Sequence, residues 1–135
     1  MWRTIRTEAV VSAVALIVVI AGSPKALAVL EDKHFDGRWV LVEAPASVPP
    51  GLQITIGHGE LLGRGPCNGF SSRWTQDDGP VGGIGSTLMA CGPGQEIMRA
   101  EDAYFGLLGH VTSVSLEHGQ LVLSTDDGRL VYDRR

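Results

Sequence analysis

Beyond residue 36, apolar residues alternate with polar ones over short stretches, and turns containing glycine or proline separate these stretches. Strict alternation over about four to eight residues is typical of a half-buried β-strand. The stretches predicted as strands are 38–43, 52–56, 60–64, 69–75, 81–89, 112–116, 120–124 and 129–132. The pattern therefore predicts about eight short strands, of which the glycine-rich stretch 81–89 is the least regular.

One stretch has helical periodicity instead. Apolar residues recur there at spacings of three and four, namely Ile97, Ala100, Tyr104, Leu107 or Leu108, and Val111. The opposite face is predicted to be polar and to carry Glu96, Arg99, Glu101 and Asp102. Pro93-Gly94 precedes this stretch and Gly109 is a natural end. We therefore expect one amphipathic helix whose apolar face packs on the strands.

A mostly antiparallel sheet has to hide or remove its edges, and a single helix of about 12 residues covers only one open side. Closing or strongly curling the sheet meets this requirement. The predicted fold class is therefore mostly β with one α-helix: a small antiparallel β-barrel-like or strongly curled sheet of about eight strands, with the helix packed at one end or flank.

The N-terminal segment has a different character. Arg3 and Arg6 precede an apolar run at 9–22, and Ala26-Leu27-Ala28 follows Pro24, which is the order of a secretory signal peptide. The run is shorter than the roughly 18 to 20 residues that a membrane-spanning helix needs. We predict a signal peptide at 1–28 and an exported domain at 29–135, periplasmic or extracellular. The alternative is an uncleaved segment that anchors the domain to the membrane.

Removal of the predicted signal changes the charge balance. The whole chain has 11 Lys and Arg against 15 Asp and Glu, but residues 29–135 have 8 against 14. The phosphates of nucleic acids and the headgroups of anionic lipids attract Lys and Arg, which are the minority here. We therefore expect no nucleic-acid partner, and membrane contact only through an uncleaved signal segment.

Cys67 and Cys91 both remain in the predicted exported domain. An even cysteine count in an oxidising compartment is most simply one disulfide, which would stabilise the fold by roughly 3.5 kcal/mol. Two free buried thiols, or a redox or metal site, are the alternatives. The chain has no Cys-x-x-Cys sequence and no zinc-ligand spacing, which favours the disulfide.

Several motifs together resemble the META domain family, also called HslJ-like. They are Gly37 to Leu41, the Gly-Pro-Cys-Asn-Gly-Phe-Ser sequence at 65–71, Ser86 to Cys91, the helix residues Glu101, Phe105 and Leu108, and the closing stretches around Leu121 to Leu123 and Asp127 to Leu130. The resemblance covers about residues 35–133. Ser72 and Trp74 depart from it, because the family usually has Gly and Tyr after the Phe-Ser pair.

The resemblance implies a compact β-barrel-like fold with a helix, in proteins found at or beyond the bacterial inner membrane. It implies no established reaction, although members have been linked to stress or drug tolerance. On this resemblance we assign structural roles to the motif residues Trp39, Asn68, Phe70, Thr87, Met89 and Ala90.

The remaining polar residues do not form a recognised catalytic or metal motif. The serines lack a nucleophile elbow, the four histidines are scattered, and the Asp-Asp pairs lack calcium-loop spacing. We therefore predict no enzymatic activity, no cofactor and no metal. Trp74 is a candidate for an exposed binding surface, with burial against the barrel as its alternative.

The function predicted from the sequence is that of an exported, non-enzymatic domain of the cell envelope. Its partner would be an envelope protein or a small ligand, and its process stress or drug tolerance. The alternative is a β-barrel that binds a small apolar ligand, which requires an internal cavity.

Overall fold

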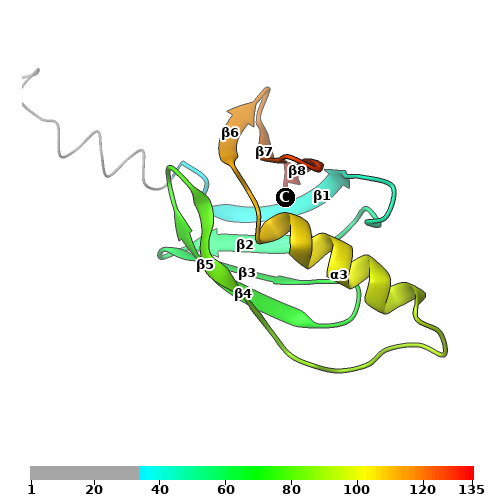
Figure 1. Cartoon of the computed structure of the whole chain (residues 1–135). Helices are drawn as coiled ribbons and strands as arrows, with labels where there is room; N and C mark the ends of the chain where they lie inside the picture. Colours follow the sequence, from blue (N-terminus) through cyan, green and yellow to red (C-terminus); the bar gives the residue numbers. More distant parts are fainter. Residues whose placement is uncertain (1–33) are drawn as a thin grey trace, which may run out of the picture. The chain divides into compact units, whose positions relative to one another are not determined.

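The computed structural model describes residues 34–135, and the predicted signal peptide at 1–28 lies outside the described residues. The elements are β1 (Gly37–Glu43), β2 (Gln53–Gly57), β3 (Glu60–Arg64), β4 (Gly69–Thr75), β5 (Gly79–Ser86), α3 (Glu96–Leu108), β6 (Ser113–Glu117), β7 (Gln120–Thr125) and β8 (Gly128–Arg134) (Figure 1). In the part of the chain that the structure describes, no helix is long and apolar enough to span a membrane.

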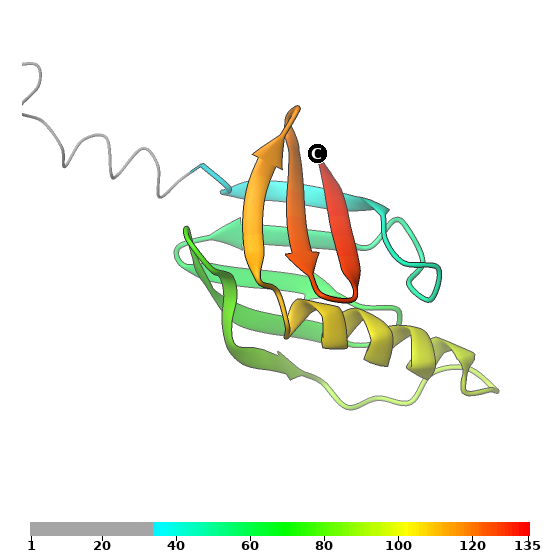
Figure 2. The same cartoon turned by 45° about the horizontal axis from the view of Figure 1, so that its top comes forward.

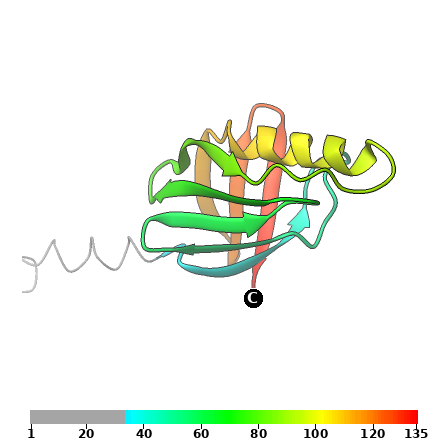
Figure 3. The same ribbon diagram turned by 90° about the horizontal axis from the view of Figure 1, so that it is seen from below.

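The strands form one antiparallel sheet in the order β5-β4-β3-β2-β1-β8-β7-β6. The sheet curls so strongly that β6, β7 and β8 cross the direction of β2 to β4 at a steep angle (Figure 2). The two edge strands β5 and β6 do not pair with each other, so the sheet is a half-barrel, and α3 lies across its open side (Figure 3). The predicted fold class, a strongly curled sheet of about eight strands with one packed helix, is confirmed.

Strand β1 joins the two halves of the sheet. It pairs with β2 through Gly37 to Val40 and with β8 through Trp39 to Glu43. The register with β8 shifts between Leu41 and Glu43, so Val42 is an extra residue on β1. A bulge of this kind increases the local twist of a strand. It therefore helps to turn the β8-β7-β6 half away from the direction of the β2-β5 half.

The interior of the half-barrel is filled by side chains from the concave face of the sheet and from α3. Fully buried large residues are Trp39, Leu41, Ile54, Ile56, Leu61, Tyr104, Leu108, Leu121, Leu123, Leu130 and Tyr132. Most of these apolar side chains come from strands, and α3 adds Tyr104, Leu107 and Leu108. Because the protein's own side chains occupy the interior, the structure argues against the alternative of an apolar ligand held inside the barrel.

Strand β5 differs from the prediction. The expected strand covered 81–89, whereas β5 spans Gly79–Ser86 and ends three residues earlier. Its register with β4 shifts between Ser71 and Arg73, where Gly82 and Gly83 have positive φ. Thr87 to Met89 leave the sheet because the side chain of Asn68 binds the main chain of Met89 in place of a neighbouring strand.

Two hairpins use the same turn sequence, His-Gly. In the β6-β7 turn, His118 has φ 54° and Gly119 has φ 80°, and His58 and Gly59 adopt the same left-handed conformation between β2 and β3. Two successive residues with positive φ form the turn that matches the twist of antiparallel strands. A residue with a Cβ is strained in this region, most of all at the second position.

We expect Gly119→Ala to lower the free energy of unfolding by about 1–2 kcal/mol, because a Cβ strains the left-handed backbone. A Cβ at this glycine would meet no atom within 4 Å, so packing does not contribute. Gly57→Ala is the matched control: its Cβ also meets nothing within 4 Å, and Gly57 lacks positive φ. Urea denaturation measures both variants, and an equal loss of stability in the two would contradict this account of the turn.

A pair of tyrosines links α3 to the sheet. The hydroxyl oxygens of Tyr104 and Tyr132 lie 2.8 Å apart, and both side chains have 0% exposure. Burial raises the pKa of Tyr104, and it raises the pKa of Tyr132 well above its usual value because the phenolate of either residue would lose its hydration. The chain has no other tyrosine.

The raised pKa values predict instability at high pH. Below about pH 10 both folded and unfolded chains carry neutral tyrosines, and above it only the unfolded chain ionises freely, so stability falls as pH rises. We expect tyrosinate absorbance and the loss of circular dichroism to appear together in an alkaline titration. Tyrosinate formed near pH 10 with a native dichroism spectrum would overturn the assignment.

Candidate functional site

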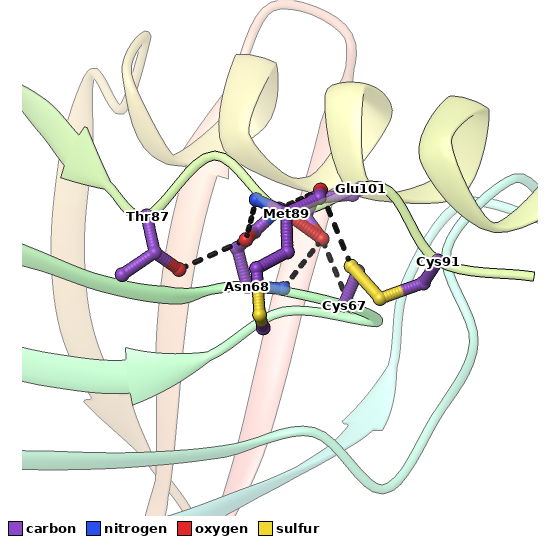
Figure 4. Close-up of a disulfide and its surroundings, with 6 residues drawn as sticks. All are labelled: Cys67, Asn68, Thr87, Met89, Cys91 and Glu101. Carbon is purple, nitrogen blue, oxygen red and sulfur yellow. Dashed lines mark hydrogen bonds between the residues drawn. A yellow bond between two sulfur atoms is a disulfide. The ribbon is translucent and has the colours of Figure 1, made fainter.

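Five of the motif residues that resemble the META domain family (Cys67, Asn68, Thr87, Met89 and Glu101) meet between the open side of the half-barrel and α3. Three segments contribute: the connection from β3 to β4, the segment that follows β5, and the second turn of α3 (Figure 4). Cys67 and Cys91 form a disulfide with their Cα atoms 5.8 Å apart, as the cysteine count predicted. It links the first of these segments to the second.

Glu101 is the centre of the hydrogen bonds in this region. The residue is 2% exposed. Oε2 accepts hydrogen bonds from the backbone N–H groups of Cys67 and Asn68, both at 2.8 Å, and Oε1 accepts one from Asn68 Nδ2 at 2.8 Å. A buried carboxylate loses its hydration, and charge-assisted hydrogen bonds of this kind compensate for that loss.

Asn68 connects Glu101 to the segment after β5, and it is also 2% exposed. Its Oδ1 accepts from Thr87 Oγ1 at 2.9 Å and from Met89 N at 2.7 Å, while Nδ2 also donates to Met89 O at 3.0 Å. The amide therefore binds both main-chain groups of Met89, as a neighbouring strand would. An asparagine amide offers two donors and one acceptor oxygen, and all are used here.

We call Cys67, Asn68, Thr87, Met89 and Glu101 the Asn68–Glu101 network. A glycine allows its elements to approach: a Cβ at Gly65 would lie 2.9 Å from the ring of Phe105 on α3 and 3.4 Å from Glu101 Cδ. Since every polar side-chain atom of Asn68 and Glu101 is bonded within the network, the arrangement holds three segments together.

The other motif residues lie elsewhere. Trp39 has 0% exposure, and the Arg134 guanidinium lies 4.2 Å from its ring centroid, while Phe70 packs against Tyr104 and Phe105. Ala90 is exposed beside the disulfide. Trp39 and Phe70 thus lie in the core, whereas Ala90 lies at the surface.

Trp74 does not belong to an exposed surface. Its side chain is 6% exposed and packs edge-on against Phe35, with ring centroids 5.7 Å apart. The residue lies on the inward-facing positions of β4, which alternate with exposed ones. The expectation of a binding surface at Trp74 is therefore wrong, and the alternative of burial is what the structure has.

The sequence pattern misplaced Glu101. We predicted it on the polar face of the helix, but it is buried with Tyr104, Leu107 and Leu108. A signal was present, because Glu101 lies three residues before Tyr104 and seven before Leu108, which puts all three on one face of a helix. A carboxylate in register with apolar positions indicates a buried polar contact.

Several surface hollows lie outside the network. One of about 520 Å³ is lined by β2 and β3, including Gln53, Leu62 and Arg64. Another of about 350 Å³ lies between α3, the loop after β1 and the turn before β8, and His110 and Asp102 line it. Within residues 34–135, no three His, Cys, Asp or Glu side chains come together in a way that could hold a metal ion.

Comparison with known proteins matches this chain to one family. The family model of the META domain matches residues 30–135. No functionally curated protein matches the chain.

Two solved structures are similar. The NMR structure of a protein from Burkholderia xenovorans is 27% identical, with a TM-score of 0.56, and the match covers 82% of this chain and 87% of the other. A second NMR structure, at 23% identity and a TM-score of 0.54, covers 73% of this chain and 88% of the other, and shows likeness of fold alone.

We expect Glu101→Gln to lower the free energy of unfolding by about 2–3 kcal/mol, because the new NH₂ group would face either a backbone N–H or Asn68 Nδ2. The adjacent Asp102 is exposed, so Asp102→Asn is a matched control with a change within about 0.5 kcal/mol. Chemical denaturation measures both. If the two variants lose the same stability, the network is not what holds α3 in place.

Proposed function

Because the chain belongs to the META domain family, we propose that it is an exported, non-enzymatic domain of the cell envelope that acts by binding an envelope protein. Stress or drug tolerance is the process that the family resemblance suggests. The observation that carries the proposal is the use of the motif residues: they bind one another, and thereby hold an exposed apolar segment in place.

Export is supported by two features. The N-terminal 28 residues have the order of a secretory signal peptide. The disulfide between Cys67 and Cys91 is compatible with an oxidising compartment.

A binding rather than a catalytic role is supported by the burial of Glu101 and Asn68 and by their hydrogen bonds to one another. A catalytic carboxylate or amide needs an atom that can reach a substrate. The carboxylate of Glu101 accepts a hydrogen bond from Cys67, and the amide of Asn68 binds Thr87 and Met89.

The segment that these bonds hold is the part of the surface best suited to contact. Leu88 is 95% exposed and Met89 is 53% exposed, although the main chain of Met89 is fixed by Asn68. Apolar side chains presented by an ordered backbone lose little conformational entropy when they bind. We therefore place the contact at Leu88.

The test is photo-crosslinking in cells that produce the full chain with a photoreactive residue at position 88. Leu62, which is 49% exposed on the sheet, is the control position. We expect position 88 to crosslink to a partner in the envelope fraction, and we expect Met89→Asp to abolish this crosslink. The recovered chain should begin at Val29. Recovery of the chain in the cytoplasm, or equal crosslinking at both positions, would contradict the proposal.

A further inference from the structure

The segment between β5 and α3 has little burial of its own. Residues 87–90 and 92–95 are exposed, and only Cys91 is half-buried. Such a segment contributes no side chain to the core, so its order depends on its tethers.

Two different tethers act on the two parts of the segment. Thr87 and Met89 are held by hydrogen bonds to Asn68 and Gly69. Residues 90–95, by contrast, make few hydrogen bonds in the described part of the chain. Those bonds join Gln95 to Arg99 at the N-terminus of α3. The disulfide at Cys91 is therefore the bond that ties this second part to the connection between β3 and β4.

The two cysteines are supported unequally. The backbone N–H of Cys67 is bound by Glu101, and Gly65 N donates to Asn68 O at 2.8 Å, so the Cys67 side has hydrogen bonds that survive without the disulfide. Cys91 is followed by Gly92 with φ 78°, then Pro93 and Gly94, and its backbone has no comparable support. Breaking the sulfur bond should release one side and leave the other in place.

We propose that the disulfide is a redox-sensitive clasp: its reduction frees residues 90–95 locally, while the sheet, Cys67 and the Asn68–Glu101 network stay ordered. The clasp goes beyond the proposed function and does not depend on it. Its effect falls on the exposed connection at 90–95, which lies between Met89 and the start of α3. Leu88 and Met89 keep their place through the network and Ile97 keeps its place in α3, so reduction loosens only the connection between them.

The reductant is a dithiol. One of its thiolates attacks Sγ of Cys91, the more exposed residue of the pair, and forms a mixed disulfide while the bond to Cys67 breaks. Cys67 leaves as a thiolate and takes a proton from water. The second thiolate of the reductant then attacks its own sulfur in the mixed disulfide and releases Cys91. Two electrons pass to the protein, and the reductant ends as a disulfide.

The test is the backbone order parameter from NMR relaxation, measured on the oxidised protein and after a dithiol reductant. We expect the order parameters of Ala90, Cys91, Gly92, Gly94 and Gln95 to fall from about 0.85 to below about 0.6 on reduction. Those of Cys67, Asn68 and the strands should stay near the rigid value.

Cys91→Ser and Cys67→Ser remove the disulfide without a reductant and should reproduce the local change. These variants therefore distinguish loss of the disulfide from other effects of the dithiol reductant. Unchanged order parameters at 90–95 would overturn the clasp. Loss of order across the strands, or at Cys67 and Asn68, would also overturn it, because the disulfide would then support the whole domain.

Discussion

The carboxylate of Glu101 accepts three hydrogen bonds in a place from which water is excluded, and the position of α3 on the half-barrel depends on it. The helix packs its apolar residues on the core, but apolar packing is not directional. Hydrogen bonds to a buried charge are directional, and leaving their partners unpaired is costly. Glu101 therefore determines which part of the β3-β4 connection meets the helix.

The contacts of Glu101 also fix the segments next to it. Glu101 holds Asn68, and Asn68 holds the main chain of Met89 as a strand neighbour would. The N–H and C=O groups of Met89 thus keep hydrogen-bond partners where the chain leaves the edge of the sheet, and the segment presents Leu88 to solvent. Asn68, Thr87 and Met89 thus support an exposed segment.

The half-barrel itself results from one strand and one helix. Strand β1 pairs on both sides, and its bulge at Val42 turns the second half of the sheet. The open side that remains between β5 and β6 is covered by α3, whose residues Tyr104 and Leu108 complete the core. The interior of the half-barrel is filled in this way.

Local patterns in the sequence determined the strands, the helix and their turns, because alternation, helical spacing and His-Gly turns act over a few residues. They also predicted the curled sheet, because eight short strands and one helix can cover the edges of the sheet in only a few ways. The hydrogen-bond partners of Glu101 and the burial of Trp74 were decided only by the tertiary structure. Glu101 meets Cys67 and Asn68, which lie 34 and 33 residues earlier in the chain. The end of β5 was decided in the same way, because the amide that replaces a strand partner for Met89 comes from Asn68, 21 residues earlier in the chain. A pattern along the chain carries no information about a partner at that distance, and hydrogen bonds to a buried group exist only once folding has excluded water.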